Sequence, residues 1–359
     1  METRTRIHDI VADVAATSGM PGLSVAVAGP DGVVSSAAAG YADLATRRPV
    51  TPDDQYLWFS MTKIATATAA MRLHAEGCLD LDAPIGEYLA GYEGHIRHGH
   101  PTTRHLLTHT AGLANPLPVR WVRPEAAQED PVEHQRILSR HQTPVRPIGS
   151  RAAYSNISYL LAAEVISAVA GQRIEQYVES AVLRPLGMHA TGFEYVGDAP
   201  RATGYVRLPR ALVPGLRWLL PPGIVGERVG GHSALRPFLV NGAGFGGLVG
   251  PVTDAVRLAS VHAGGAVPDE LWLTPVMLAE MRTMVAEGRP FDHGIGWFRR
   301  PQDAARAPGF VEHYGTGGGF WNAMRVYPGH GLAMVAMANT TRRWDVDDLF
   351  TRIGRLSWT

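Results

Sequence analysis

Lysine is nearly absent from this chain: of its 33 basic residues only Lys63 is a lysine, and the other 32 are arginines. Arginine stays protonated at any working pH, whereas a buried lysine can release its proton and act as a base. The single lysine therefore indicates a position at which a guanidinium cannot replace the amine. Lys63 follows Ser60 by three residues, about one helical turn, so the two side chains can share one face of a helix.

Other scarcities exclude several classes of protein. Cys78 is the only cysteine, so no intrachain disulfide forms and nothing requires an oxidising compartment. Acidic and basic residues balance at 33 each, which leaves no basic excess for nucleic acid. No run of 18 apolar residues occurs, so no membrane span is expected. Residues Met1 to Arg6 lack the features of a signal peptide, which predicts a cytoplasmic protein.

Histidine is common, and its densest group is the only candidate for a metal site. The group consists of His95, His98, His100, His105 and His109. No carboxylate or cysteine accompanies these residues at the spacing of metal ligands. We therefore expect neither a metal nor another cofactor.

The pattern of apolar residues predicts strands at both ends of the chain. Gly22 to Gly29 and Val33 to Gly40 are expected to be strands around a turn, and the Ser60 helix follows them. The last hundred residues contain short apolar runs punctuated by glycine, and a closing helix is expected over about Val346 to Leu356. The strands expected there are Gly294 to Arg299, Phe310 to Gly315, Phe320 to Tyr327 and Leu332 to Ala338.

Residues 80–240 have a different character. Helical patches such as Ile157 to Gly171 and Ile174 to Leu183 are separated by proline-rich connections. Strands at the two ends with helices between them predict an α/β (α+β) fold, in which N- and C-terminal strands form one antiparallel sheet flanked by helices. We expect residues 1–78 and 245–359 to form this domain, and residues 79–244 to form a mostly helical inserted domain.

The segment from Leu208 to Val240 combines five prolines with several large apolar residues. Long loops in compact domains are usually functional lids or disordered segments. The apolar content favours a lid or a pocket wall, and a packed irregular segment under the helical lobe is an equally good interpretation.

The run Ser60-Met61-Thr62-Lys63 has a simpler interpretation, in which Ser60 caps the following helix. A stabilising cap would place Glu or Gln three residues later, where it could reach back to the capping residue. Here that position holds a cation, which the positive end of the helix dipole disfavours. The pattern breaks a local rule, and that favours a functional role for the pair.

Three more segments join this pair, and each has a structural interpretation of its own. Tyr154-Ser155-Asn156 precedes a helix and could hold a helix cap beside a core tyrosine. The run from His313 through Tyr314, Gly315 and Thr316 to Phe320 could be a glycine-rich hairpin with a surface histidine. The run Leu106 to Leu113 could be a helix end stopped by glycine. Their occurrence together, in this order, makes four unrelated coincidences a poor explanation.

Taken together, these motifs resemble those of the serine β-lactamase and penicillin-binding-protein-like superfamily. The likeness is to the branch with class C β-lactamases, D-alanyl-D-alanine carboxypeptidases, family VIII carboxylesterases and related acyltransferases, and it covers about Gly22 to Asn339. The Ser-x-x-Lys run matches at Ser60 and Lys63, the Tyr-x-Asn run at Tyr154 and Asn156, and the third motif at His313-Tyr314-Gly315. Supporting matches are Leu79 to Asp82, Leu106 to Leu113, Gly246-Gly247-Leu248 with Asp254, and Gly294 to Trp297.

The resemblance implies a β-lactamase/transpeptidase-like fold and an acyl-enzyme mechanism. Ser60 would be the nucleophile, Lys63 would accept its proton, directly or with Tyr154, and Tyr154 would protonate the leaving group. The backbone amides of Ser60 and Thr316 would form the oxyanion hole. Asn156, His313 and Gly315 would also belong to the substrate site. His313 replaces a lysine that many lactamases carry, and a neutral imidazole suits an uncharged ester better than a carboxylate.

Within the superfamily we expect a carboxylesterase or acyltransferase that acts on a small, partly apolar ester or thioester. The partner is then a small-molecule acyl donor, with no nucleic acid and no membrane span. Three alternatives stay open: a biosynthetic transacylase that forms an amide or ester, a β-lactamase or D-alanyl-D-alanine carboxypeptidase, and a non-catalytic binding module. Loss of the serine, lysine or tyrosine is usual in such modules, and here all three are present.

Overall fold

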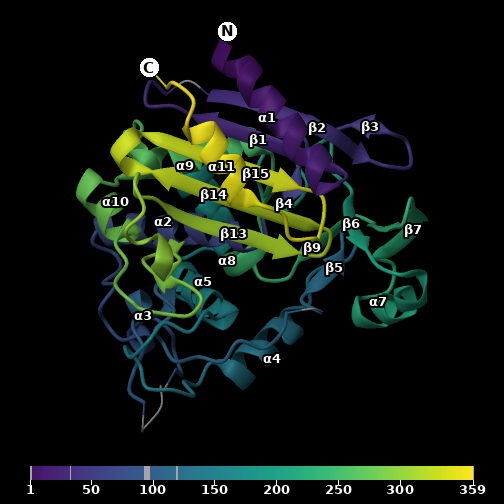
Figure 1. Cartoon of the computed structure of the whole chain (residues 1–359). Coiled ribbons are helices and arrows are strands. Elements are labelled where there is room, and N and C mark those ends of the chain that lie inside the picture. Colours follow the sequence, from purple (N-terminus) through teal and green to yellow (C-terminus); the bar gives the residue numbers. More distant parts are fainter. Residues whose placement is uncertain (1, 33, 93–97, 119, 359) are drawn as a thin grey trace.

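A large antiparallel sheet is built from the two ends of the chain. The computed structural model describes residues 2–32, 34–92, 98–118 and 120–358. Within them, eight strands pair in the order β11-β12-β13-β14-β15-β1-β2-β3 (Figure 1). The strands are β1 (Gly22–Ala28), β2 (Val34–Asp43), β3 (Arg48–Pro49), β11 (Asp292–His293), β12 (Phe298–Arg299), β13 (Val311–Gly317), β14 (Phe320–Tyr327) and β15 (Leu332–Ala338). The predicted α/β class and its sheet of terminal strands are confirmed.

The central strands of this sheet are buried on both faces. Every residue of β1 and β15 is buried, as the continuous apolar runs of these strands require. β1 lies between β15 and β2, with Val25 opposite Ala336 on one side and Ala37 on the other. The N- and C-terminal parts of the chain are therefore joined at the middle of the sheet.

Helices cover both faces of the sheet. Alternate residues of a strand point to opposite faces. Val25 and Val27 pack in one apolar cluster with α1 and α11, whereas Ala26 and Ala28 pack in another with α2 and α9. Figure 1 shows α1 and α11 in front of the sheet and α9 and α2 behind it. These helices are α1 (Glu2–Ser18), α2 (Thr62–Ala75), α9 (Val252–Ala263) and α11 (Val346–Gly354).

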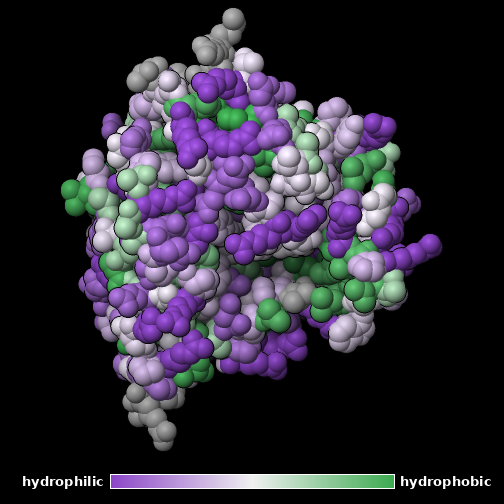
Figure 2. Space-filling model, in the orientation of Figure 1, coloured by the Kyte–Doolittle hydropathy of each residue, from purple (hydrophilic) through white to green (hydrophobic). Residues whose placement is uncertain are grey.

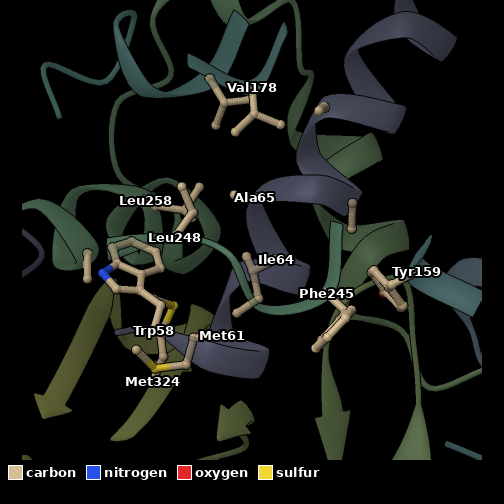
Figure 3. Close-up of a cluster of buried hydrophobic side chains, with 14 of the residues drawn as sticks. Trp58, Met61, Ile64, Ala65, Tyr159, Val178, Phe245, Leu248, Leu258 and Met324 are labelled. Atoms are coloured by element: carbon tan, nitrogen blue, oxygen red, sulfur yellow. The ribbon is translucent and has the colours of Figure 1, made fainter. Parts of the chain in front are cut away.

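Helix α2 is the central helix of the molecule, and almost all of its residues are buried. Alanine and threonine dominate it, which lets neighbouring elements approach closely. In Figure 3, Trp58, Met61 and Met324 pack at one side of its first turns, and Phe245 and Tyr159 pack at another. The start of α2 is thereby fixed from several directions.

Most of the remaining helices lie in the middle of the chain. Helix α5 is buried over most of its length, and it contacts α2, α3 and α8. The helices are α3 (Thr103–Leu107), α4 (Pro131–His141), α5 (Asn156–Ala170), α6 (Ile174–Val178) with a π-helical continuation (Glu179–Leu183), α7 (Val213–Leu219), α8 (Ala243–Gly246) and α10 (Pro275–Arg282). No helix in the described ranges could cross a membrane alone; Asn156–Ala170 and Ile174–Leu183, bent by 75°, reach the length and composition only as a pair.

The proline-rich segment from Leu208 to Val240 is more regular than expected. Strands β7 (Val225–Val229) and β8 (His232–Leu235) form a hairpin, and β8 also pairs with β6 (Gly204–Arg207). The turn uses Gly230 and Gly231, both with positive φ, which is the backbone region that glycine favours. The two adjacent glycines therefore indicate the hairpin turn in this segment, whereas its prolines suggested an irregular structure. Two further sheets of two strands pair β4 (Tyr56–Leu57) with β10 (Val249–Gly250) and β5 (Val122–Pro124) with β9 (Phe238–Val240).

One predicted strand is wrong, and one helix was not predicted. Gly294 to Arg299 is not one strand, because its first four residues connect β11 to β12. Gly296 has a φ of +80°, and a β-carbon there would lie 2.8 Å from the Cβ of Ala67, so this connection is shaped by its packing on α2. Helix α9 was not predicted from the sequence; it interrupts the strand-rich C-terminal part and packs against β15.

Candidate active site

Ser60 and Lys63 lie together at the start of α2. Ser60 sits in a 3-10 turn over Phe59–Met61 that continues into the helix, and the Nζ of Lys63 is 3.1 Å from its Oγ. No side chain caps either the turn or the helix. The interpretation of Ser60 as a helix cap is therefore wrong, and the three-residue spacing brings its hydroxyl to the amine.

The backbone before Ser60 has an unusual conformation. Phe59 has a φ of +47°, a region that costs a residue with a side chain of order 1–3 kcal/mol unless its surroundings enforce it. Strand β13 holds Phe59 in this conformation, because the glycines of the strand pack against the turn. A β-carbon at Gly315 would lie 1.9 Å from the carbonyl oxygen of Trp58, and one at Gly317 would lie 2.1 Å from the ring of Phe59. Thr316, between them, lines the same cleft as Ser60.

Tyr154 comes from the helical part of the chain and reaches the same serine. Its hydroxyl donates a hydrogen bond of 2.7 Å to Ser60 Oγ, and the Nζ of Lys63 lies 4.8 Å from its ring centroid. Ser155 is the N-cap of α5, where its Oγ accepts from the amide of Ser158. The capping interpretation of Tyr154-Ser155-Asn156 was therefore correct for Ser155, while the residues on either side of it face the serine–lysine pair.

Lys63 is fully buried and has uncharged partners. Its Nζ donates to the Oδ1 of Asn156 at 2.9 Å and to the carbonyl oxygen of Phe245 at 3.0 Å. Burial holds the pKa of the Lys63 amine well below its usual value, and no carboxylate among the described residues offsets this effect. The Phe245 carbonyl reaches the amine because Gly244 packs tightly on α5, where a β-carbon would lie 2.3 Å from the carbonyl oxygen of Tyr159.

Three buried histidines surround Tyr154. The ring centroid of His109 lies 4.5 Å from that of Tyr154 and 4.8 Å from that of His293, and the centroid of His313 lies 6.5 Å from that of Tyr154. Burial is the main cause that lowers the pKa of all three, and for His293 it falls to about 4. At neutral pH the imidazoles are therefore uncharged, so they do not neutralise or repel the other groups of the site.

The hydrogen bonds of two imidazoles define which ring nitrogen holds the proton. The Nδ1 of His313 lies 2.9 Å from the carbonyl oxygen of Tyr314, which can only accept, so Nδ1 carries the proton. The Nδ1 of His109 accepts from the backbone amide of Ser155 at 3.1 Å, so its proton is on Nε2. His313 lines the cleft, and its Nε2 is left as an acceptor.

A cleft of about 1510 Å³ opens beside Ser60. Of the residues proposed from the sequence, Ser60, Tyr154, Asn156, His313 and Thr316 line it, whereas Gly315 lies against Trp58 and Lys63 is behind the serine. The rest of the lining mixes aromatic and charged side chains: Phe291, Phe298, Tyr314, Trp321 and Trp344 with Arg289, Arg300, Arg343, Asp345 and Asp347.

The segment from Leu208 to Val240 is not a wall of this cleft, since none of the described lining residues comes from it. Its Phe238 packs against Gly318 in the β13–β14 turn and against the turn before α2, where its ring centroid lies 6.4 Å from that of Phe59. This segment therefore does not form the pocket wall that the sequence suggested.

The histidine group considered for a metal is dispersed. His95 lies outside the described residues, His105 forms a capping box with Thr102, and His109 packs on Tyr154. The part of the chain that the structure describes contains no group of three or more side chains suited to hold a metal ion.

Some parts of the site were not identified from the sequence. His109 belongs to the supporting run Leu106 to Leu113, but nothing in that run assigned it a place beside Tyr154. His293 was not singled out, and its position just before the Gly294 run was the available signal. Nothing in the sequence could indicate that the carbonyl oxygen of Phe245 contacts Lys63, because every residue has the same backbone oxygen.

Comparisons with known proteins show the family and the fold of this chain. The model of the Beta-lactamase family matches residues 7–356. Esterase EstB from Burkholderia gladioli is 28% identical over 334 residues, which cover 84% of this chain and 82% of the esterase. A crystal structure of SurE with D-Leu is 26% identical, has a TM-score of 0.72, and matches 99% of this chain and 75% of SurE.

The fold is shared even where the sequences have diverged further. The D-amino acid amidase from Ochrobactrum anthropi, complexed with D-phenylalanine, has a TM-score of 0.77 at 23% identity, with 98% of each chain matched. Because the family model spans nearly the whole sequence, the likeness is not confined to the short motifs. The chain belongs to the Beta-lactamase family of serine hydrolases.

Proposed function

We propose that this chain is a serine carboxylesterase or acyltransferase that works through an acyl-enzyme on Ser60. The observation that carries the proposal is the fully buried amine of Lys63, which lies 3.1 Å from Ser60 Oγ and has no carboxylate partner in the part of the chain that the structure describes. Burial favours the uncharged form of such an amine, and in that form it can accept a proton.

The hydrogen bonds around Lys63 fit a neutral amine. Such an amine has two protons and one lone pair. The protons match the oxygens of Asn156 and Phe245, and the lone pair matches the hydroxyl proton of Ser60. Ser60 Oγ in turn accepts from the hydroxyl of Tyr154. Asn156 is then a positioning residue that orients the base.

Tyr154 is suited to the role of acid. Burial raises the pKa of its phenol, and the hydrogen bond to Ser60 opposes this only in part, so the resting group keeps its proton. This assigns the base to Lys63 and the acid to Tyr154. General acid or base catalysis by one positioned group typically contributes about 10²–10⁴ in rate.

In the proposed reaction, Ser60 Oγ forms a bond to the carbonyl carbon of the ester while its proton moves to Lys63 Nζ. The bond from that carbon to the leaving oxygen then breaks, Tyr154 gives the departing alkoxide a proton, and the proton held by Lys63 restores the neutral tyrosine. Water repeats these steps in reverse and releases the acid, whereas an alcohol or amine acceptor would leave with the acyl group as an ester or amide. The amides of Ser60 and Thr316 are proposed to bind the oxyanion, where one lost donor costs about 3 kcal/mol.

The cleft supports a small, partly apolar ester or thioester as the substrate. Several aromatic rings line it beside Ser60. His313, which is neutral, stands where many relatives with β-lactamase activity would present a fixed cation, and that gives less support to a β-lactam carboxylate. The similarity to esterase EstB points in the same direction.

Short-chain p-nitrophenyl esters test this function. The natural protein should release p-nitrophenol and acquire the mass of the acyl group, and Ser60→Ala should do neither. Lys63→Arg should lose about 10² or more in turnover because the guanidinium keeps its proton. Equal turnover by the natural protein and Ser60→Ala would exclude Ser60 as the nucleophile.

Acyl transfer to an amine is a second candidate, favoured by the structure of SurE with D-Leu. Addition of D-Leu or L-Leu to the ester assay distinguishes transfer from hydrolysis. A product in which D-Leu carries the acyl group, formed faster than the free acid, would support a transacylase. Formation of the free acid alone would support the esterase.

A further inference from the structure

Helix α7 presents an unusually exposed apolar surface. None of its residues is buried, and beside it Leu212 is 56% exposed, while Trp218 near its end is 75% exposed. Leu117, from another segment, is 84% exposed, and the guanidinium of nearby Arg120 lies 5.4 Å from the ring centroid of Trp218. Figure 2 shows hydrophobic and strongly hydrophilic residues side by side over the position that α7 has in Figure 1. We call this region the α7 surface.

The part of the chain that carries α7 is also basic. Residues 207–236 contain five arginines and one acidic residue, Glu227, a net charge of +4 in a chain whose net charge is zero. All five arginines are exposed. Their positions are Arg207, Arg210, Arg217, Arg228 and Arg236.

A groove at the segment that leads into α7 brings two of these arginines together with Arg342. It has a volume of about 830 Å³, and Arg207, Arg228 and Arg342 line it together with the apolar side chains of Val206 and Leu208. No ion pair with an acidic side chain neutralises any of these three arginines within the described residues, and Arg228 donates only to the carbonyl oxygen of Leu208. The groove therefore combines apolar walls with guanidinium groups free to bind an anion.

We propose that the α7 surface docks on anionic phospholipid membranes. Trp218 and Leu212 would enter the headgroup region, and Arg207, Arg228 and Arg342 would contact lipid phosphates. Exposed tryptophan and leucine interleaved with arginine are typical of segments that lie in a membrane interface. Each basic residue near an anionic surface contributes about 1 kcal/mol, or about fivefold in partitioning.

The charge of the α7 surface also argues against a second copy of this chain as its partner. A two-fold interface places the same patch on both subunits, so +4 would face +4. Like charges across an interface oppose association. An anionic lipid surface carries the opposite charge and would therefore attract the same arginines.

Docking in this way would orient the cleft. Arg342 lines the groove of the α7 surface, and its neighbour Arg343 lines the cleft beside Ser60. The mouth of the cleft would therefore lie close to the membrane, where apolar esters accumulate. The docking proposal does not depend on the chemistry proposed for Ser60, and its test measures binding rather than turnover.

Flotation of the full chain with lipid vesicles tests the proposal. We expect the protein to float with vesicles that mix phosphatidylglycerol and phosphatidylcholine, and not with vesicles of phosphatidylcholine alone. Salt at about 1 M, where the Debye length is about 3 Å, should release it. Arg207→Gln, Arg228→Gln and Arg342→Gln together should weaken partitioning about a hundredfold. Trp218→Ser should weaken it about tenfold.

Matched variants control for charge and for exposed tryptophan. Arg140→Gln, Arg151→Gln and Arg355→Gln remove three exposed arginines elsewhere, and Trp272→Ser removes a tryptophan that is 60% exposed elsewhere. These variants should float like the natural protein, and circular dichroism should be the same for all. Absence of flotation, or equal losses in test and control variants, would overturn the proposal. A change of oligomeric state on Trp218→Ser would overturn it in favour of an interface between copies.

Discussion

The Oδ1 atom of Asn156 lies 2.9 Å from the Nζ of Lys63, so an amide occupies the place where a carboxylate would form an ion pair. An amide oxygen accepts a hydrogen bond from either form of the amine without adding negative charge. A carboxylate at that distance would favour the ammonium ion strongly. The choice of asparagine is therefore consistent with a lysine that must lose its proton in order to act.

Asn156→Asp should move the pH dependence of activity. The new carboxylate raises the pKa of Lys63, so the neutral amine forms only at higher pH, and the acid limb of kcat/KM should shift to higher pH. The profile is measured with a p-nitrophenyl ester. Asn156→Ala removes the same contact without a charge and should lower the rate with a smaller shift. An unchanged acid limb in Asn156→Asp would show that this limb does not report Lys63.

Gly315→Ala should damage both activity and stability. Its β-carbon would lie 1.9 Å from the carbonyl oxygen of Trp58, and a backbone atom cannot rotate away. Strand β13 must then move from the Phe59–Ser60 turn, which should cost about 1–3 kcal/mol of stability, as overpacking usually does. Gly309→Ala is the matched control, because a β-carbon there meets nothing within 4 Å. Equal unfolding midpoints for the two variants would contradict the prediction.

Tyr154→Phe should lower kcat by about 10²–10⁴, because it removes the acid that serves the leaving group. The acid limb should remain in place, since Lys63 is still the base. Tyr159→Phe removes another buried hydroxyl, which donates to the carbonyl oxygen of Leu107 and not to Ser60. That control should lose about 1 kcal/mol of stability and little activity. Similar activity in the two variants would argue against the role of Tyr154.

Asp347→Asn should destabilise the protein in a pH-dependent way. Burial raises the pKa of Asp347, but the hydrogen bonds from Arg300 and Arg325 outweigh it and lower the pKa to about 2. A folded pKa below the unfolded value of about 3.9 stabilises the protein above pH 4, and this stabilisation is lost as the pH falls towards 2. The cost of Asp347→Asn at neutral pH should be about 1–2 kcal/mol, since solvent screens part of the interaction.

Urea unfolding at neutral pH and near pH 2 measures this dependence. The difference between Asp347→Asn and the natural protein should shrink at the lower pH. Asp348→Asn, on the exposed side of the same helix, should cost less at neutral pH. A difference that stays constant with pH would show that the Asp347 carboxylate does not contribute through its charge.

The sheet was readable from the sequence where strands are buried on both faces. Strands β14 and β15 have the bounds expected from their apolar runs, Phe320–Tyr327 and Leu332–Ala338. Such strands carry their signal in their own residues. The connection from Gly294 to Trp297 could not be predicted from its own residues. Its shape depends on contact with Ala67, more than two hundred residues away in the chain. The hairpin of β7 and β8 was not predicted, because the prolines on both sides of it indicated an irregular segment.

The candidate site divides in the same way. Ser60 and Lys63 could be placed together because a helical turn sets their distance, and Tyr154 could be added from the order of the motifs. The surroundings that lower the pKa of Lys63 could not be predicted. The same holds for two other parts of the site: the Phe245 carbonyl, which depends on the close packing of Gly244 on α5, and His293, which meets His109 only in the folded chain.

The scarcity of lysine permits a direct test of the central claim. With one lysine in the chain, selective labelling of lysine with ¹³C and ¹⁵N gives a single side-chain signal in the NMR spectrum, and Lys63→Arg should remove it. We expect this signal to titrate well below the ordinary lysine pKa of about 10.4, so that the amine is uncharged at neutral pH. A signal that keeps the shift of an ammonium ion up to pH 10 would contradict the account.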